Sequence, residues 1–186
     1  MDSSHETEEL VVLVGADGRP AGTAPKATVH TADTPLHFAF SAYVLDPEGR
    51  LLLTRRALSK RTWPGVWTNS FCGHPGPGEI TVAAVRRRAS EELGLQPAQL
   101  GAVEEVLPDF SYRATDSSGI VEYEVCPVFV VRLTGPVALA VNPEEVDAWV
   151  WAAPADVVAA ARALPEVFSQ WMVAELADPR LVAALG

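Results

Sequence analysis

The stretch that decides the fold is residues 73–95, which read GHPGPGEITVAAVRRRASEELGL. Its beginning is rich in glycine and proline, which indicates a loop. From about residue 81 to residue 93, apolar side chains recur on one helical face: Val82, Val85, Ala89 and Leu93. Gly94 follows, where helices commonly end on a residue in the left-handed conformation. The stretch therefore predicts a loop that leads into a helix with charged residues near its end.

These charged residues follow the Nudix signature, G-x5-E-x7-R-E-U-x-E-E-x-G-U, in which U is apolar. The positions that agree with it are Gly73, Glu79, Arg87, Ala89, Glu91, Glu92, Gly94 and Leu95. The stretch thus resembles the Nudix superfamily, and the match is far more specific than a lone glycine loop. Carboxylates at the end of such a helix are hard oxygen ligands for Mg²⁺, which bridges to diphosphate oxygens. For any single charge the alternative is a solvated helix face, with Arg87–Glu91 and Arg88–Glu92 as ion pairs.

One position departs from the signature, because Arg88 stands where the pattern has glutamate. The resemblance implies that this glutamate is a metal ligand that Nudix hydrolases use to cleave diphosphates. A guanidinium binds a diphosphate well but cannot hold a metal ion. The helix is therefore predicted to hold a diphosphate rather than to cleave it.

The chain has 186 residues, which favours one domain, and its 48% apolar and 20% charged residues exclude disorder for most of it. A net charge of -10 excludes a general attraction for nucleic acid or an anionic membrane, so an anionic ligand needs a local basic pocket. Residues 1–9 are predicted to be a flexible tail and residues 10–186 a single catalytic domain. We expect a cytoplasmic protein with both cysteines reduced, because no secretion signal or long apolar run occurs. The oligomeric state is open, and a monomer is the default because the sequence indicates no apolar surface patch.

The order of elements is mostly strands with one central helix and two late helices. Strands are predicted over residues 10–14, 37–45, 51–55, 103–107, 109–114, 121–133 and 149–151, helices over 81–93, 154–164 and 165–177, and loops over 19–35 and 56–78. This order indicates an α+β fold, an α/β/α sandwich in one domain.

A second candidate metal site involves three histidines and two glutamates. His30 and His37 flank the entrance to a predicted strand, and His74 follows in a tight turn. Glu122 and Glu124 are two residues apart on a strand, so both point to one face. Two carboxylates held that close raise each other's pKa unless a cation or a shared proton intervenes. The set could form a mixed nitrogen and oxygen site for Zn²⁺, Mn²⁺ or Mg²⁺, and the alternative is a strand edge that faces water.

Four runs closely resemble type 1 isopentenyl-diphosphate isomerase, a family with a Nudix-type fold of mixed sheet and flanking helices. They are HTADTPLH at residues 30–37, TRRALSK at 54–60, WPGVWTNSFCGHP at 63–75 and EYEVCP at 122–127. The resemblance spans about residues 20 to 175. It implies an enzyme of isoprenoid biosynthesis that interconverts isopentenyl and dimethylallyl diphosphate by adding a proton at one carbon and removing one from another.

The resemblance also implies roles for individual residues. Cys72 and Glu124 would be the two proton carriers, Tyr112 would hydrogen-bond near Glu124, and Trp171 would face the carbocation. The first metal ion would be held by His30, His37, His74, Glu122 and Glu124, and a Mg²⁺ that bridges to the diphosphate would be held by Glu92. The diphosphate would be bound by Lys26, Arg56, Lys60 and Arg88. The resemblance does not fix which carrier gives the first proton.

Two other functions compete with the isomerase. A Nudix hydrolase of a nucleoside or other diphosphate would need a complete set of carboxylates on the helix, and Arg88 counts against it. A non-catalytic, metal-stabilised binding module would explain the histidines but would leave Cys72, the basic residues and Trp171 without a shared purpose. From the residues alone, the favoured interpretation of Cys72 is a small buried residue in a tight turn, and only the resemblance to the family reverses this.

Overall fold

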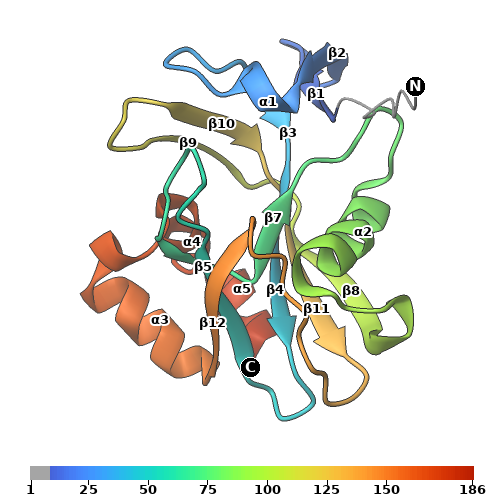
Figure 1. The fold of residues 1–186 in the computed structure, drawn as a ribbon, viewed down its shortest axis with the longest axis vertical. Helices are drawn as coiled ribbons and strands as arrows, with labels where there is room; N and C mark the ends of the chain where they lie inside the picture. The colour runs from blue at the N-terminus through green and yellow to red at the C-terminus, as the bar shows by residue number, and fades with distance from the viewer. Residues whose placement is uncertain (1–8) are drawn as a thin grey trace, which may run out of the picture.

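The computed structural model describes residues 9–186, and its strands form two β-sheets (Figure 1). Residues 1–8, which make up most of the predicted tail, lie outside the described part of the chain. The small sheet has the order β2-β1-β3-β10-β9, with β1 (Leu10–Val14), β2 (Pro20–Pro25), β3 (His37–Phe38), β9 (Ser111–Thr115) and β10 (Val121–Val125). The division into a tail and one domain stays a prediction.

The large sheet is mixed and has the order β12-β5-β4-β11-β8. Its strands are β4 (Phe40–Leu45), β5 (Leu51–Arg56), β8 (Leu100–Leu107), β11 (Val128–Leu133) and β12 (Val146–Ala152), with the short strands β6 (Trp67–Thr68) and β7 (Phe71–Gly73) paired to β5 and β4. Strand β11 runs parallel to β4 and antiparallel to β8.

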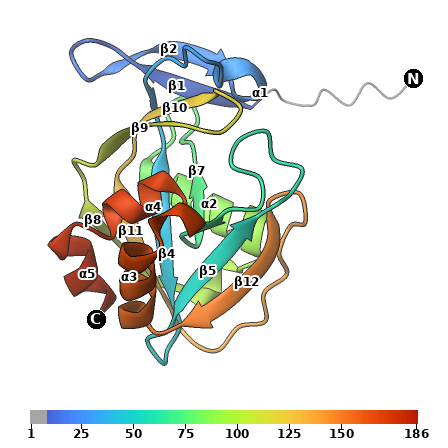
Figure 2. The same cartoon turned by 90° about the vertical axis from the view of Figure 1, so that its left-hand side faces the viewer.

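Helices cover both faces of the large sheet (Figures 1 and 2). Helix α2 (Thr81–Leu93) lies on one face, and α3 (Pro154–Ala163), α4 (Gln170–Glu175) and α5 (Pro179–Leu185) lie on the other, while the short α1 (Lys26–Val29) follows β2. Alternate side chains of β4 point to opposite faces of the sheet. Ala42 and Val44 pack in the core under α2, and Tyr43 and Leu45 pack in the core under α3–α5. The predicted α/β/α sandwich is confirmed.

The central helix is confirmed at both ends. Gly94 follows α2 with φ 69°, and its backbone N–H returns to carbonyls of the last turn, as in a left-handed cap. Three of the four residues predicted on the apolar face, Val85, Ala89 and Leu93, are fully buried. Val82 differs: it is 37% exposed, because it lies in the first turn, where the core beneath the helix ends.

Five predicted segments differ from the structure. The predicted strand 37–45 divides at Ala39 into β3 and β4, which belong to different sheets, and the predicted loop 56–78 contains the short strands β6 and β7. The predicted loop 19–35 contains β2 and α1; β2 is an edge strand, where proline is tolerated because one side of the strand needs no partner. The predicted single strand 121–133 is two strands in different sheets, divided at Pro127. The predicted helix 165–177 is a 3₁₀ turn (Pro165–Val167) and α4, because Phe168 leaves the helical path to bridge to Trp67.

The two sheets meet where two neighbouring chain segments pass from one sheet into the other. Strand β3 runs parallel to β10 in the small sheet, and after Ala39 the chain continues as β4, which runs parallel to β11 in the large sheet. The Ala39 N–H donates to the Val125 carbonyl (2.9 Å) and the Ser41 N–H to the Pro127 carbonyl (3.1 Å), so the junction is tightly bonded. Among the described residues, no helix is both long and apolar enough to cross a membrane.

Candidate active site

A cavity of about 580 Å³ opens at the junction of the two sheets. Twelve of the thirteen residues predicted for the site line it: Lys26, His30, Arg56, Lys60, Cys72, His74, Arg88, Glu92, Tyr112, Glu122, Glu124 and Trp171. The thirteenth, His37, is fully buried beside Glu124. The fold thus gathers residues from distant parts of the chain into one place, and their roles stay predictions.

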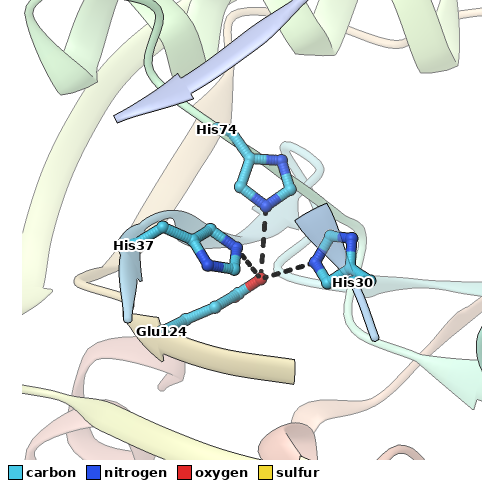
Figure 3. A group of neighbouring side chains, drawn as sticks. All are labelled: His30, His37, His74 and Glu124. Atoms are coloured by element: carbon cyan, nitrogen blue, oxygen red, sulfur yellow. Dashed lines mark hydrogen bonds and ion pairs between the residues drawn. The ribbon is translucent and has the colours of Figure 1, made fainter. Parts of the chain in front are cut away.

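Three imidazoles surround one carboxylate oxygen of Glu124 (Figure 3). The Nε2 atoms lie 3.2 Å (His74), 3.4 Å (His37) and 3.9 Å (His30) from Glu124 Oε1. Strand pairing sets part of this arrangement, because Glu124 on β10 is the direct partner of His37 on β3. The four ligand atoms lie within 4.8 Å of one another, so these residues could hold a metal ion.

The hydrogen bonds of His37 indicate that a cation belongs in this group. His37 Nδ1 lies 2.8 Å from the Pro35 carbonyl, which can only accept, so Nδ1 carries the hydrogen and Nε2 offers a lone pair. That lone pair faces a carboxylate oxygen, and only a proton or a metal ion between the two relieves their repulsion. Within residues 9–186, the buried Nε2 atoms of His30 and His37 have no hydrogen-bond partner. The donor set therefore fits a divalent metal ion.

Glu122 lies on the same wall of the cavity but is not one of the four residues of that group. Its Oε1 accepts a hydrogen bond from Thr62 (3.0 Å), and its Oε2 accepts one from Tyr112 (2.9 Å). Burial, and then the negative charge of Glu124, raise the pKa of Glu122. Burial also opposes ionisation of Glu124, but the three neighbouring histidines hold its pKa well below its usual range.

The Tyr112 hydroxyl lies between the carboxylates of Glu122 and Glu124, and its hydrogen bond near Glu124 was expected from the sequence. The hydroxyl is 2.9 Å from Glu122 Oε2 and 2.9 Å from Glu124 Oε2. Strand β9 places it there, because Tyr112 is the direct partner of Glu124 in the pairing of β9 with β10. A phenol has a single hydrogen, so it donates to one carboxylate at a time and links the two.

Cys72 reaches the cavity from the large sheet, whereas Glu124 reaches it from the small sheet. Both cysteines are free thiols, and Cys126 is buried in the core. Cys72 Sγ lies 3.6 Å from the Ser41 hydroxyl, across the pairing of β7 with β4. Burial, followed by the nearby charge of Glu175, raises the pKa of the Cys72 thiol.

Trp171 forms an aromatic wall of the same cavity and is 1% exposed. Its ring contacts Trp63 edge to face, with centroids 5.3 Å apart, and lies near Tyr112, with centroids 5.7 Å apart. The guanidinium carbon of Arg56 is 5.6 Å from the centroid of the Trp171 ring. The ring therefore already interacts with one cation in this structure.

Most of the basic residues predicted for the diphosphate are engaged in ion pairs. Lys26 contacts Glu9, the last residue of the predicted tail, at 2.8 Å, and Lys60 contacts Glu145. Arg88 contacts Glu92 at 2.5 Å and Glu145 at 3.3 Å. Arg56 instead donates to the Thr62 carbonyl at 3.0 Å.

Both ion pairs of the solvated-face alternative are present, but only one of them lies on the surface. Arg87 and Glu91 have side chains 35% and 43% exposed, as that alternative expects. Arg88 and Glu92 are 9% and 8% exposed and line the cavity, which a solvated face does not explain. The buried carboxylate of Glu92 and the partly buried carboxylate of Glu145 share Arg88, so this wall offers hard oxygen ligands beside a cation.

Sequence reasoning missed several residues of this site. Glu145 and Thr62 line the cavity from loops, where the sequence carries no periodic signal. Asn69 stands in the WPGVWTNSFCGHP run, but its side chain received no role. Glu175 could have been found, because it is a charged residue four positions after Trp171 on the buried face of a short helix.

Glu175 predicts a specific dependence of stability on pH. The carboxyl is fully buried, one oxygen accepts from the Tyr43 hydroxyl at 2.6 Å, and burial raises its pKa to about 7. Because the folded state holds this proton more tightly than the unfolded state, the free energy of unfolding falls as pH rises from about 4.5 to above 7, by up to about 3 kcal/mol. We expect Glu175→Gln to remove this loss, as measured by urea unfolding at pH 5.5 and pH 8. An unchanged difference between the two pH values would contradict the prediction.

Known proteins resemble this chain in both sequence and fold. The NUDIX domain family matches residues 35–172. An isopentenyl-diphosphate Delta-isomerase of Corynebacterium glutamicum is 56% identical over 177 residues, which are 95% of this chain and 94% of the relative. One of Kocuria rhizophila is 52% identical over 185 residues, 99% of each chain. The chain belongs to the isopentenyl-diphosphate Delta-isomerases of the NUDIX family. This confirms the resemblance stated from the sequence.

A solved structure agrees on the fold. The crystal structure of DR0079 from Deinococcus radiodurans matches with a TM-score of 0.68 and covers 91% of this chain and 98% of that one. At 20% identity this likeness shows the fold alone.

Proposed function

We propose that this protein interconverts isopentenyl diphosphate and dimethylallyl diphosphate in the cavity at the junction of its two sheets. The observation that carries the proposal is that a thiol from one sheet and a carboxylate from the other, Cys72 and Glu124, line the same cavity as the buried aromatic Trp171. Membership of the isomerase family supports it. A NUDIX hydrolase would need neither the thiol nor the three histidines, and Arg88 replaces a carboxylate of its signature.

The two carriers meet the demands of the reaction. An unactivated alkene is a very weak base, so it needs a strong acid held against it in a site that excludes water. In our proposal one of the two carriers gives its proton to the alkene electron pair, which leaves a tertiary carbocation. The other carrier, as its conjugate base, then removes a proton from the neighbouring carbon, and the C–H electron pair becomes the new double bond. Tyr112 holds the Glu124 carboxylate in place through its hydrogen bond.

The carbocation needs protection that the cavity can supply. Trp171 would face it, and cation–π attraction contributes about 2 kcal/mol when the site is desolvated. The diphosphate would be held by Lys26, Arg56, Lys60 and Arg88. Arg88, Lys60 and Lys26 would exchange their carboxylate partners for phosphate oxygens. Every proposed group comes from one chain, so a monomer is sufficient.

The metal ligands in this proposal are His30, His37, His74, Glu122 and Glu124, with Mn²⁺, Zn²⁺ or Mg²⁺ as the ion, and Glu92 for a separate Mg²⁺. When bound, the first ion would increase the acidity of the Glu124 carboxyl, and Mg²⁺ at Glu92 would neutralise charge on the diphosphate. The lone pair that His37 directs at Glu124 supports the first site.

The proposal is tested by incubating the protein with isopentenyl diphosphate and Mg²⁺ and following both the allylic product and released phosphate. We expect dimethylallyl diphosphate to form without phosphate release. Phosphate release from this or from nucleoside diphosphates, with the alkene unchanged, would favour the hydrolase and overturn the proposal.

Loss of one histidine should weaken the metal site. We expect His30→Gln, which changes the most exposed of the three imidazoles, to lower the affinity for Mn²⁺ by at least about 100-fold, because even outer partners of metal ligands contribute 10- to 100-fold. Mn²⁺ bound per chain is measured after equilibrium dialysis. The control is Glu105→Gln, which removes an exposed charge on β8. Equal Mn²⁺ binding by both variants would contradict the site.

A further inference from the structure

A buried amide connects the proposed proton carrier with the proposed aromatic wall. Asn69 lies between β6 and β7 and is fully buried. Its side chain contacts Cys72 Sγ through both polar atoms, with Nδ2 at 3.3 Å and Oδ1 at 3.4 Å. Oδ1 also accepts a hydrogen bond from Trp171 Nε1 at 3.0 Å. One side chain therefore bonds to both groups.

The orientation of this amide is fixed by the chemistry of its other neighbours. Nδ2 donates to the Ala42 carbonyl (3.1 Å) and the Phe71 carbonyl (2.8 Å), which can only accept. Oδ1 faces the Trp171 N–H, which can only donate. A flipped amide would set donor against donor and acceptor against acceptor in a site without water access. The two atoms that Asn69 presents to Cys72 are therefore assigned without ambiguity.

Hydrogen bonds through Thr68 and Ser169 also connect Asn69 to the beginning of α4. The Thr68 hydroxyl donates to Asn69 Oδ1 (2.8 Å) and lies 2.8 Å from the Ser169 hydroxyl. The Ser169 N–H donates to the Trp67 carbonyl at 2.9 Å, just before α4 begins. The start of α4, and with it the Trp171 ring, is thus tied to the strand that precedes Asn69.

We propose that Asn69 is a positioning residue of the isomerase, which holds Cys72 Sγ and the Trp171 ring in one fixed relation across the substrate cavity. The inference rests on the proposed function. If Cys72 removes a proton from a carbocation that Trp171 faces, the sulfur and the ring must be placed relative to each other as well as to the substrate. A displacement of about 1 Å between reacting groups costs about 10²-fold in rate.

An amide suits this position because it can hydrogen-bond to the Cys72 sulfur both as a thiol and as a thiolate, the two forms that the reaction requires. A thiol can donate its hydrogen to Oδ1, and a thiolate can accept from Nδ2, whose two hydrogens are then shared among the sulfur and the Ala42 and Phe71 carbonyls. Both contacts exist with the sulfur in one place, so Cys72 can give and take its proton without moving. An aspartate of the same size has no N–H to offer and would repel a thiolate.

The first test compares Asn69→Asp with the wild type in steady-state kinetics. We expect kcat to fall by at least about 10²-fold, while KM changes little because the diphosphate contacts are elsewhere. Asn142→Asp is the matched control: it adds the same charge at the other asparagine of the chain, and its Oδ1 can still accept from the Glu144 N–H. Thr68→Val, which removes one donor to Oδ1 without adding a charge, should lower kcat about tenfold. Unchanged kcat in both Asn69→Asp and Thr68→Val would overturn the proposal.

A second measurement does not depend on isomerase activity. In a Cys126→Ala background, only Cys72 can be alkylated by iodoacetamide. We expect Asn69→Asp to slow this alkylation about tenfold, because the thiolate loses an N–H donor and gains a negative neighbour. Faster alkylation would mean that the variant merely opens the cavity. An equal rate would mean that the Asn69 amide does not stabilise the Cys72 thiolate. Either result overturns the proposal. If the wild type does not isomerise its substrate, the proposed function fails while this test still reports on Asn69.

Discussion

Glu124→Gln is expected to abolish isomerisation, with kcat reduced by more than about 10⁴-fold. The single change removes a proton carrier, which alone is worth about 10²–10⁴-fold, and also removes the charge on which three histidines converge. Glutamine keeps the size of the side chain and can still accept from Tyr112, so the cavity should remain formed. Product formation from isopentenyl diphosphate is measured at saturating Mg²⁺.

The same variant should also lose bound Mn²⁺, because a neutral amide is a weak ligand between three imidazoles. Glu105→Gln is the control for loss of one negative charge and should keep full activity. If Glu124→Gln retained more than about a tenth of the wild-type kcat, Glu124 would not be a proton carrier.

Cys72→Ala is expected to lower kcat by about 10³–10⁴-fold and to leave metal binding intact. The thiol lines the cavity but is not a member of the group of three histidines and Glu124. The loss should therefore appear in the chemical step and not in the amount of Mn²⁺ bound. Activity is measured by the same product assay, with metal content measured on the same samples.

Cys126→Ala provides the matched control, because it removes the other buried thiol, which lies 3.5 Å from the same Ser41 hydroxyl. We expect it to lower stability by about 1–2 kcal/mol through a small cavity and to keep most of its activity. Equal loss of activity in the two variants would mean that the serine-linked pair of thiols acts as a structural unit and that Cys72 carries no proton.

Much of the fold could be predicted because its signals are local. The apolar spacing and the glycine after residue 93 give the helix α2 its ends, and both are correct. The failures have a common physical cause, which is pairing between distant segments. Residues 20–25 form a strand only because β1 offers a partner along one edge. Residues 121–133 divide because the chain passes from one sheet to the other at Pro127.

The candidate site was predictable in its members but not in its arrangement. Spacing alone placed Glu122 and Glu124 on one face of a strand, and the resemblance to a family supplied the rest. The sequence did not determine whether that face of the strand is exposed to solvent. In the structure both carboxylates are buried, and Tyr123, on the other face, is exposed. Asn69 and Glu175 acquire their partners only through β4 and α4, and no pattern within the chain indicates such long-range contacts.

The most direct measurement is an NMR experiment on isopentenyl diphosphate in D₂O with Mg²⁺, run on the wild type, Cys72→Ala and Glu124→Gln. We expect the wild type to form dimethylallyl diphosphate with deuterium in a methyl group and to release no phosphate, while both variants leave the substrate almost unconverted. Unlabelled product from the wild type, or labelled product formed at the wild-type rate by either variant, would contradict proton addition and removal by these two residues.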